Sequence, residues 1–389
     1  MRVIEFTAGA AMTYLHRSWA RLYRADEHAT AYQSPLWLTA WARHRAPGRE
    51  PFIVSVHDHR GPVAALALTR HVDSDGRRRI TALSAPAAEC IRPLGPGAEH
   101  PAVAAALAGH LHHLADDRTE VYLPDLPADS ALARHAQRLW SGSCTQTPYA
   151  TVPLPLDLTG LSRSTRRDHQ RRRRALHALG DRVTYHRTHS KEQLLAAYRV
   201  LEQLHHQRNA DRPPTGALTA NASLPWPAVL SSCAPMAFIA TLELDGQAVA
   251  AQLCLHHGRH AYSLLAGMDP RHRALAPGHT LLRLLAEDLT ATGFTALDLG
   301  RTTADPGQRA YKAAYGASWR LSTSVSTQAA SSLPAAREPL CRSTPAAVGP
   351  PPAVRRPRWP PGGGAPGRPG GGVGGGVPPG GAGGGGGGV

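Results

Sequence analysis

The feature that most constrains the fold is an order of secondary-structure elements that occurs twice along the chain. In the first half, the residue pattern predicts two helices, three strands, a helix, a strand, a helix and a strand. Ser34 and Pro35 mark the start of the second helix, because serine caps helices and proline suits their first position. The expected ranges are 10–24, 34–45, 51–56, 63–69, 78–83, about 101–115, 119–123, about 129–140 and 148–156.

The same order returns roughly 185 residues later. Asp245-Gly246 and His257-Gly258 predict hairpin turns between its three strands, and a Pro-rich connection at 211–227 precedes them. The expected ranges are 162–179 and 190–209 for two helices, 237–244, 247–255 and 260–267 for three strands, then a helix at 278–291, a strand at 296–299, a helix carrying Lys312 and a strand at 317–325. We therefore expect two similar α/β lobes, from element order and not from matched residues.

The character of the chain changes beyond about residue 326. Ser, Thr, Ala and Pro give way to an almost pure glycine tract, which offers no side chains to bury and loses much conformational freedom on ordering. We expect residues 326–389 to be disordered. The same composition also fits an altered reading frame or a mispredicted gene end.

Charge and cysteine usage limit the classes of function. The formal net charge of +15 indicates attraction to anions such as phosphate-rich cofactors, nucleic acid or acidic lipid. Five scattered cysteines without a CxxC pair argue against a disulfide framework or zinc site, and we expect no metal. The first 25 residues lack an apolar core and no segment runs 18 apolar residues, so we expect a cytoplasmic protein without membrane insertion.

One strand end carries several candidate functional residues. The run Leu297–Arg301 predicts a short buried strand that brings Asp298 and Arg301 to its carboxyl end, where ligands often bind in α/β sheets. The helix that follows carries Lys312. Only Lys312 and Lys191 among the 43 basic residues are lysine, which favours a specific need for an ammonium group, although an ordinary surface lysine remains the alternative.

A second candidate site lies at the start of the helix expected at 278–291. Pro277 and Gly278 allow a tight turn, so we expect the N–H groups of Gly278, His279 and Thr280 to point out of the helix N-terminus. Such groups bind phosphate. An ordinary helix start with a Pro-Gly turn is the structural alternative.

The motifs together resemble a known family. Asp245-Gly246, Gly267-Met-Asp-Pro270, Pro277-Gly278, Leu297-Asp-Leu-Gly300 and Tyr311-Lys312…Tyr315-Gly316 are similar, in this order, to the CelD-type branch of the GNAT acyltransferases. That branch is related to the Fem-type aminoacyl ligases, which are also built from two GNAT-like lobes. The resemblance covers roughly residues 30–325 and is strongest at 156–320.

The resemblance implies transfer of an acyl group from acetyl-CoA or another acyl-CoA to an amine or hydroxyl. It assigns Gly278, His279 and Thr280 to the donor phosphates and makes Lys312 the transition-state stabiliser. Asp269 and Asp298 become candidates for acceptor orientation or proton relay. Each aspartate also has a structural reading, Asp269 as a turn residue and Asp298 as a buried partner of Arg301. The substrate pocket is assigned to Tyr311, Tyr315 and Arg301.

The phosphate-loop motif of GNAT enzymes, Gln/Arg-x-x-Gly-x-Gly/Ala, does not match the sequence at 273–280. This mismatch weakens the prediction of coenzyme A binding more than the prediction of the fold. The arginines at 163, 166, 167 and 171–174 form a charged helix that could receive tRNA or a nucleotide-linked acceptor, or simply a solvated face.

We therefore predict a GNAT-like mixed sheet with flanking helices, in two tandem lobes followed by a disordered tail. The expected domains are a degenerate lobe at 1–155, the acyltransferase lobe at 156–325 and the tail at 326–389. The acceptor is a small molecule or a cell-envelope precursor. Two alternatives remain: a Fem-type ligase that uses aminoacyl-tRNA, and a non-catalytic basic protein that binds nucleic acid or another polyanion.

Overall fold

The computed structural model describes residues 1–44, 48–72, 76–85, 87–209, 226–303 and 305–328. The described residues all belong to one compact unit. From residue 329 onward, the expected disordered tail lies outside them.

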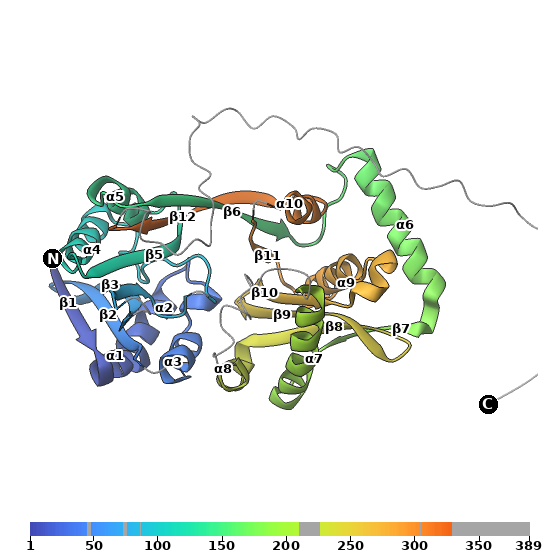
Figure 1. Ribbon diagram of the computed structural model, residues 1–389, viewed down its shortest axis with the longest axis horizontal. Helices are drawn as coiled ribbons and strands as arrows, with labels where there is room; N and C mark the ends of the chain where they lie inside the picture. The colour runs from blue at the N-terminus through green and yellow to red at the C-terminus, as the bar shows by residue number, and fades with distance from the viewer. Residues whose placement is uncertain (45–47, 73–75, 86, 210–225, 304, 329–389) are drawn as a thin grey trace, which may run out of the picture. The chain divides into compact units, whose positions relative to one another are not determined.

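Both halves of the described chain contain the same succession of elements (Figure 1). The first half consists of β1 (Arg2–Thr7), α1 (Ala8–Tyr14), a π-helical turn (Leu15–Trp19), α2 (Ala20–Ala25), α3 (Pro35–His44), β2 (Glu50–Asp58), β3 (Gly61–Val72), β4 (Arg78–Ala82), α4 (Pro101–His113), β5 (Thr119–Pro127), α5 (Ala131–Leu139) and β6 (Cys144–Pro153). The second half consists of α6 (Arg163–Leu179), β7 (Val183–Arg187), α7 (Lys191–Asn209), α8 (Trp226–Cys233), β8 (Ala237–Leu244), β9 (Gln247–His257), β10 (His260–Met268), α9 (Pro277–Ala291), β11 (Ala296–Arg301), α10 (Pro306–Ala313) and β12 (Ser318–Ser326).

The predicted mixed α/β architecture and the repeat are confirmed, but the two halves correspond differently from our expectation. The sequence pattern missed β1, β7 and α8. With these included, each half reads strand, helices, three strands, helix, strand, helix, strand, and α6 precedes the second repeat as an addition. The missed strands are edge strands in which all residues are at least partly exposed, and neither contains more than two consecutive apolar residues.

All strands form one twelve-stranded sheet in the order β1-β2-β3-β4-β5-β12-β6-β11-β10-β9-β8-β7. β6 belongs to the first half of the chain but pairs with β11 of the second, and β12 lies between β5 and β6. The halves therefore exchange their last strands. We call β1–β5 with β12 and their helices lobe 1, and β6–β11 with their helices lobe 2. The sequence boundaries 1–155 and 156–325 stay a prediction.

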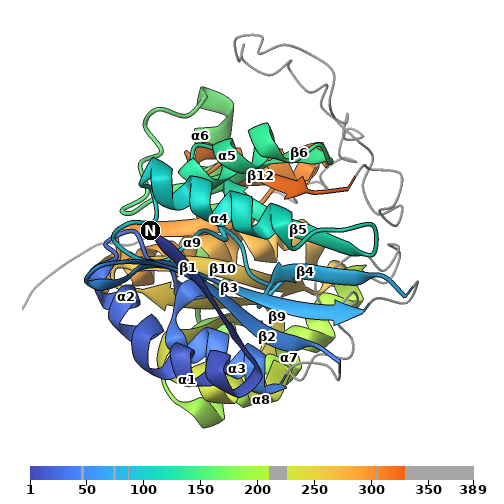
Figure 2. The ribbon, with the colours of Figure 1, turned by 90° about the vertical axis from the view of Figure 1, so that its left-hand side faces the viewer.

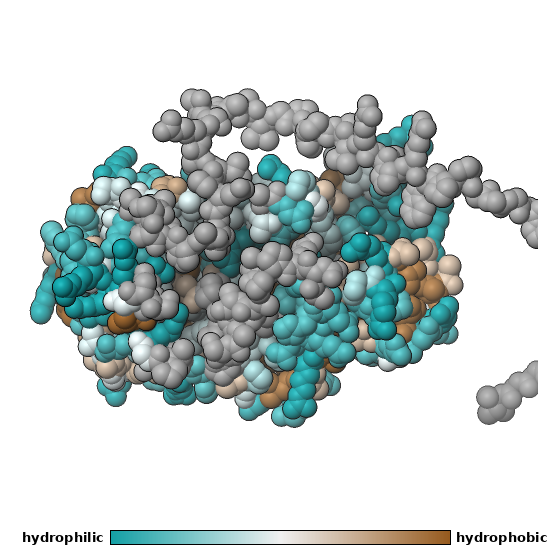
Figure 3. Space-filling view, in the orientation of Figure 1, coloured by the Kyte–Doolittle hydropathy of each residue, from teal (hydrophilic) through white to brown (hydrophobic). Residues whose placement is uncertain are grey.

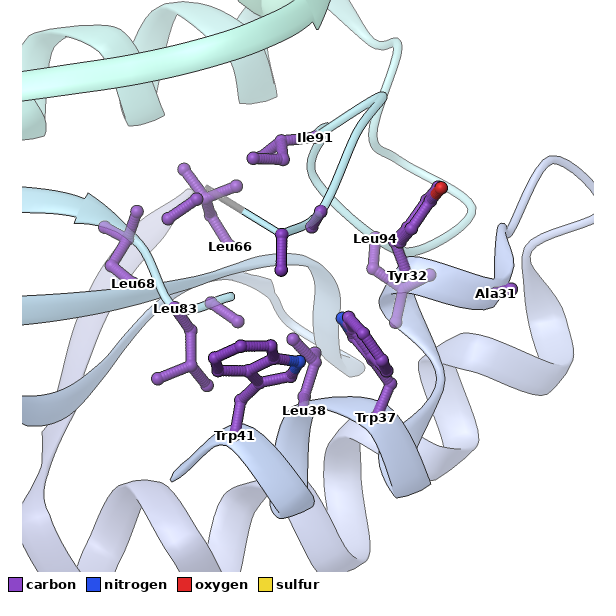
Figure 4. Packing of buried hydrophobic residues seen from close by; sticks show 14 of the residues in the cluster. Ala31, Tyr32, Trp37, Leu38, Trp41, Leu66, Leu68, Leu83, Ile91 and Leu94 are labelled. Atoms are coloured by element: carbon purple, nitrogen blue, oxygen red, sulfur yellow. The ribbon is translucent and has the colours of Figure 1, made fainter. Parts of the chain in front are cut away.

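Buried side chains join the two lobes. Trp37 and Trp41 of α3 pack on Trp226 of α8, with ring centroids 5.5 Å apart for Trp41 and Trp226. Figure 4 shows Leu38 between Trp41 and Trp37, with Leu94 above Trp37. The lobes therefore share one hydrophobic core, to which α7 and α8 contribute on one face of the lobe 2 sheet.

The opposite face of the lobe 2 sheet packs against α9. Leu281 and Leu285 of α9 contact a cluster that includes Leu297 and Leu299 of β11 and Tyr315. Successive residues of a strand point to opposite faces, so Asp298 faces away from this cluster. Figure 2 shows α1, α3, α7 and α8 gathered on one side of the strands and α4 and α5 on the other. The two faces of β11 therefore meet different surroundings.

Candidate active site

A gap in the sheet separates β10 from β11. The two parallel strands pair only where His260, Ala261 and Tyr262 lie beside Ala296, Leu297 and Asp298. Beyond Tyr262, a bulge between Ser263 and Leu265 bends β10, and residues 263–268 pair with β9 but not with β11 in the described part of the chain. The edge of β10 that faces β11 therefore has no strand partner beyond Tyr262 among the described residues, and the Ala266 carbonyl accepts from Nδ1 of His205 at 3.1 Å. An unpaired strand edge can bond a ligand through its backbone groups.

Lobe 1 has the equivalent parallel pair, β4 and β5, but its own chain occupies the space beyond it. The Ile91 N–H donates to the carbonyl of Asp125 on β5, at 3.0 Å. Leu94 exchanges two backbone hydrogen bonds with Ala65 on β3, at 2.7 and 2.8 Å. Ala87, Ala88, Ile91 and Leu94 are buried. Segment 87–94 thus fills in lobe 1 the position of the gap in lobe 2.

The same segment brings Glu89 to the end of β11. One carboxylate oxygen of Glu89 accepts from Nε of Arg301 at 3.0 Å, and the other accepts from the Arg301 N–H at 3.1 Å. Gly300 makes this approach possible: its φ is +70°, and a Cβ there would lie 2.5 Å from Oε2 of Glu89. The glycine of the predicted Leu297–Gly300 motif therefore has a packing reason.

Two further carboxylates surround Arg301. Asp125 accepts from Nη1 of Arg301 at 3.0 Å and is almost fully buried. Asp298 accepts from the Gly300 N–H at 2.6 Å and from the Thr151 hydroxyl at 3.2 Å. The structural reading of Asp298 as a partner of Arg301 is not supported, because Glu89 and Asp125 contact that guanidinium.

The electrostatics of this cluster raise the pKa values of Glu89 and Asp298. Burial raises the pKa of Glu89 to about 7, with Arg301 opposing the shift and Asp298 and Asp125 adding to it. Burial also raises the pKa of Asp298, although hydrogen bonds from Gly300 and Thr151 work against the shift. Glu89 is thus suited to exchange a proton near neutral pH.

Tyrosines border the cluster on the same face of the sheet. Tyr149 is opposite Arg301, Thr151 is opposite Asp298, and Tyr262 is beside Asp298. Neighbours in register share a face. Tyr32, from the turn before α3, packs edge-on against Tyr262 with centroids 5.5 Å apart.

The Tyr149 hydroxyl is buried and has no hydrogen-bond partner within the described residues. The Tyr32 hydroxyl points away from Trp37 (Figure 4). Burial raises the pKa of both phenols, with the charge of Glu89 adding to the shift. The two tyrosines therefore border the carboxylates with neutral hydroxyls.

Lys312 of α10 contacts the backbone at the end of β11. Its ammonium donates to the carbonyls of Gly300 at 2.8 Å and Arg301 at 2.6 Å, and only 4% of the residue is exposed. Burial lowers the pKa of Lys312 to about 8, while Glu89 and Asp298 oppose the shift. These contacts hold the end of β11 in place. They do not favour the expected direct contact with a transition state.

The expected phosphate cradle at the start of α9 is not present. The N–H groups of His279 and Thr280 both donate to the carbonyl of Ala276, at 2.9 and 3.1 Å, and Pro277 has no N–H. The prediction of three outward donors is therefore wrong: α9 begins at Pro277, directly after Ala276, whose φ of 48° is left-handed, and two of the three N–H groups bond to the Ala276 carbonyl.

Aromatic residues cover the same helix end. The hydroxyls of Tyr311 and Tyr315 donate to the carbonyls of Gly278 and His279, at 3.0 and 2.9 Å. His169 of α6 packs edge-on against Tyr315. Tyr311, Tyr315 and His279 therefore lie together with α9, on the opposite face of the sheet from Asp298. The structure separates the predicted pocket residues Tyr311 and Tyr315 from Arg301.

Asp269 lies apart from both groups. Its side chain accepts from the N–H of Arg271 at 2.9 Å and forms an ion pair with the guanidinium of Arg271 at 2.7 Å. It begins the turn Pro270–Leu275. These contacts favour the structural reading of Asp269 over a role in acceptor orientation.

The arginine-rich helix α6 lies at the end of lobe 2 (Figure 1). Six of its arginines are exposed and Asp168 is its only acidic residue. Its apolar residues Leu176 and Leu179 line a groove together with Val183 and Leu275. Figure 3 shows hydrophobic residues gathered near the lower end of α6 on a mostly hydrophilic face.

Sequence reasoning missed Glu89, Asp125 and Tyr149. Glu89 lies in an irregular stretch between β4 and α4 without a motif, and its partner Arg301 is 212 residues away in sequence. Asp125 lies inside a strand, with a φ of 55°. One signal was available in the sequence: the first half has no motif equivalent to Leu297–Arg301. That difference could have indicated that lobe 1 has another role than lobe 2.

Within the described residues, no helix combines the length and apolar character needed to cross a bilayer. The same residues contain no group of three or more His, Cys, Asp or Glu side chains arranged to hold a metal ion.

Comparisons with solved structures bear on the fold. FemX is 12% identical with a TM-score of 0.56, and the match covers 83% of this chain and 97% of FemX. The C-terminal domain of a protein described as a lysylphosphatidylglycerol synthetase, from Agrobacterium fabrum, is 14% identical with a TM-score of 0.52; the match covers 82% of this chain and 94% of that domain. At such identities these likenesses show the fold alone.

Comparisons of sequence bear on the activity. No curated protein sequence matches the chain significantly. Residues 163–313 match the family model described as "Acetyltransferase (GNAT) domain", which spans α6 to α10 and includes β10, β11 and the gap between them. This stretch is therefore a GNAT-type acetyltransferase domain, and the chain that contains it is an acyltransferase.

Proposed function

We propose that the chain is an N-acyltransferase that moves an acyl group from acyl-CoA to an amine or hydroxyl of a small molecule or cell-envelope precursor. The observation that carries the proposal is the gap between β10 and β11, with Glu89 and Asp298 on one face of the sheet beside it. An acyl-CoA thioester and its amide-containing arm suit such a gap, because an open strand edge offers backbone hydrogen bonds. The narrower assignment to the CelD-type branch remains a prediction.

The two faces of the sheet suggest separate routes for the two substrates. The donor would enter from the face covered by α9 and α10. The acceptor would enter from the face that carries Tyr262 and Asp298, where lobe 1 contributes Glu89. Backbone N–H groups of β10 beyond Tyr262 would stabilise the oxyanion that forms on the thioester carbonyl. Lys312 would position the end of β11 through its two carbonyl contacts.

Contacts for the donor phosphates differ from the sequence-based expectation, because the His279 and Thr280 N–H groups are already bonded. Arg172 of α6 is partly exposed, and its Nη1 lies 3.3 Å from Nδ1 of His279 at the start of α9. We propose Arg172 as the cation that meets the pyrophosphate.

A second candidate function, a Fem-type ligase that uses aminoacyl-tRNA, is favoured by α6. Exposed arginines, among them Arg167, Arg171 and Arg174, give this helix an extended basic surface, which is a typical footprint for a nucleic-acid backbone. In this reading the chemistry at the β10–β11 gap is the same and only the carrier of the acyl group differs.

The experiment that separates the donors is the melting temperature of the full chain with acetyl-CoA, coenzyme A or total tRNA. A ligand at 100 times its dissociation constant adds ~2.7 kcal/mol to the free energy of unfolding, enough for a shift of a few degrees. We expect acetyl-CoA to raise the melting temperature of the wild type. The increase should be smaller for Arg172→Gln. A shift with tRNA alone, lost when Arg167, Arg171 and Arg174 become glutamine, would favour the ligase.

A further inference from the structure

The basic side chains around the candidate site differ in their partners. Arg301 pairs with Glu89 and Asp125, and the Lys312 ammonium donates to two backbone carbonyls. Arg320 of β12 is exposed, and it forms no ion pair or hydrogen bond in the described part of the chain. Its guanidinium is therefore available to a ligand.

The strand register places Arg320 on the face of the sheet that carries Asp298. Arg320 is opposite Tyr149 of β6, and Thr151, two residues further along β6, donates its hydroxyl to Asp298. Side chains two residues apart on a strand, and neighbours in register, share a face. β5 pairs with β12 only from Ser322 onward, so its strand pairing ends before it reaches Arg320.

The charge of Arg320 acts on groups of the site. Burial raises the pKa of Asp298 and lowers the pKa of His260, and the positive charge of Arg320 favours the deprotonated form of both. Lys312 acts on Asp298 in the same direction. Arg320 thus extends its influence from β12, across β6 and β11, to His260 on β10.

His260 offers a second donor on this face. It is partly exposed and stacks on Tyr262, with ring centroids 5.4 Å apart, and Tyr262 lies beside Asp298. The ring nitrogens of His260 have no hydrogen-bond partner within the described residues. A neutral imidazole has one N–H to donate. Two side chains with donors to spare, from strands on either side of Asp298, therefore border the same part of the site.

The net charge of the site does not oppose an anion. Its three carboxylates are matched by three cations: Glu89, Asp125 and Asp298 against Arg301, Lys312 and Arg320. Burial raises the pKa of Glu89 to about 7, so proton uptake near neutral pH makes the site positive. An anionic group can therefore bind beside the exposed guanidinium without facing an excess of negative charge.

We propose that the acceptor carries an acidic group, a carboxylate or a phosphate, which binds to the Arg320 guanidinium with the His260 imidazole as a second donor. A guanidinium suits both groups, because its N–H groups form paired hydrogen bonds with their oxygens. The inference rests on the proposed acyl transfer and deepens it by naming a chemical class of acceptor.

The sheet also sets the spacing within the acceptor. Three strand spacings of ~4.8 Å separate β12 from β10, and the Arg320 side chain spans part of that distance. The acidic group and the group that receives the acyl chain at the β10–β11 gap are therefore several bonds apart in the acceptor.

The test measures binding of small anions to the full chain without any acyl donor, by calorimetry at pH 7.5 and constant ionic strength. Glycerol 3-phosphate probes a phosphate, glycerate probes a carboxylate, and glycerol is their neutral counterpart. We expect saturable binding of at least one anion and none of glycerol. Arg320→Gln should weaken that binding about 10-fold or more, because charge-assisted hydrogen bonds are lost.

Four further variants make the result specific. Asp298→Asn removes a nearby negative charge and should tighten anion binding severalfold. His260→Ala should weaken it severalfold. Arg17→Gln is the matched control, because Arg17 is also exposed and without a partner in the described residues, and it should bind like the wild type. Arg172→Gln tests whether the anion occupies the proposed pyrophosphate contact instead.

The proposal is overturned if neither anion binds better than glycerol, or if Arg320→Gln binds as tightly as the wild type. Loss of binding in Arg172→Gln with full binding in Arg320→Gln would also overturn it. Because no acyl donor is present, the result is independent of whether acetyl-CoA is the donor, which the melting experiment with acetyl-CoA tests separately.

Discussion

The two lobes share one topology but differ at the same place in it. In lobe 2, β10 and β11 part after three paired residues and leave a gap. In lobe 1, segment 87–94 fills the corresponding space and forms backbone hydrogen bonds with β3 and β5. The helix starts differ as well: Nδ1 of His100 caps α4 by accepting from Ala102, whereas α9 follows Ala276 without a side-chain cap. Lobe 1 thus lacks the gap, and the segment that fills its place supplies Glu89 to lobe 2.

The difference teaches that a repeated fold can specialise by filling one of its two sites. The lobes remain physically dependent on each other because they exchange their last strands and share the core of Trp37, Trp41 and Trp226.

The largest effect is expected from removal of β12. A chain that ends at residue 316 leaves β5 and β6 without their shared neighbour, so lobe 1 loses a strand and the sheet is interrupted between the two lobes. We expect loss of cooperative unfolding, measured by circular dichroism during heating. Ending the chain at residue 328 is the control and should leave melting unchanged. Cooperative melting of the shorter chain would show that the lobes are more independent than the sheet indicates.

The next largest effect concerns the contribution of lobe 1 to chemistry. Glu89→Gln removes the proposed base, and we expect kcat/KM to fall about 100-fold, within the usual range for general bases. Because burial raises the pKa of Glu89 to about 7, wild-type activity should fall as pH drops below about 7. The variant should lose this acidic limb. A variant with the wild-type pH profile would exclude Glu89 as the base.

A smaller effect is expected where the lobes touch. Gly300→Ala places a Cβ 2.5 Å from Oε2 of Glu89 and also strains a backbone with φ of +70°. Gly293→Ala is the matched control, since its φ is +86° but nothing lies within 4 Å. We expect Gly300→Ala to lower the free energy of unfolding by about 1–3 kcal/mol more than the control. Urea denaturation measures both variants. Equal decreases in the free energy of unfolding for Gly300→Ala and Gly293→Ala would mean that the Glu89 side chain moves away without cost.

The smallest expected effect is on the pH dependence of stability and concerns His279 at the start of α9. Burial lowers the pKa of His279 to about 3, so between pH 6.5 and 5 the unfolded chain binds a proton there that the folded chain does not. This histidine therefore makes stability fall as pH drops through that window. Glu89 has the opposite effect on stability in this window, because its pKa is raised in the folded chain. Glu89 is present in every variant compared, so its effect cancels.

We expect His279→Gln to lose less stability than the wild type between pH 7 and pH 5, measured by urea denaturation. His177→Gln, at an exposed position of α6, should behave like the wild type. An unchanged slope for His279→Gln would mean that His279 is solvated.

The sequence predicted the repeat, the hairpins and the strand Leu297–Arg301 because these depend on local patterns of apolar residues and turn residues. It failed where neighbours in space decide the outcome. The exchange of β6 and β12 depends on pairing between distant strands. The role of Glu89 depends on Gly300, whose missing side chain admits the carboxylate. The three N–H groups of Gly278–Thr280 do not all point outward as expected, because the helix begins one residue earlier than the pattern indicated, at Pro277, and His279 and Thr280 bond to Ala276.

Amide hydrogen exchange with and without acetyl-CoA tests most directly whether lobe 2 keeps the donor site and lobe 1 has lost it. We predict slower exchange at residues 263–268 of β10 and 299–301 of β11, with 87–94 and β5 unchanged. Protection in lobe 1, or none in lobe 2 at saturating acetyl-CoA, would contradict the account.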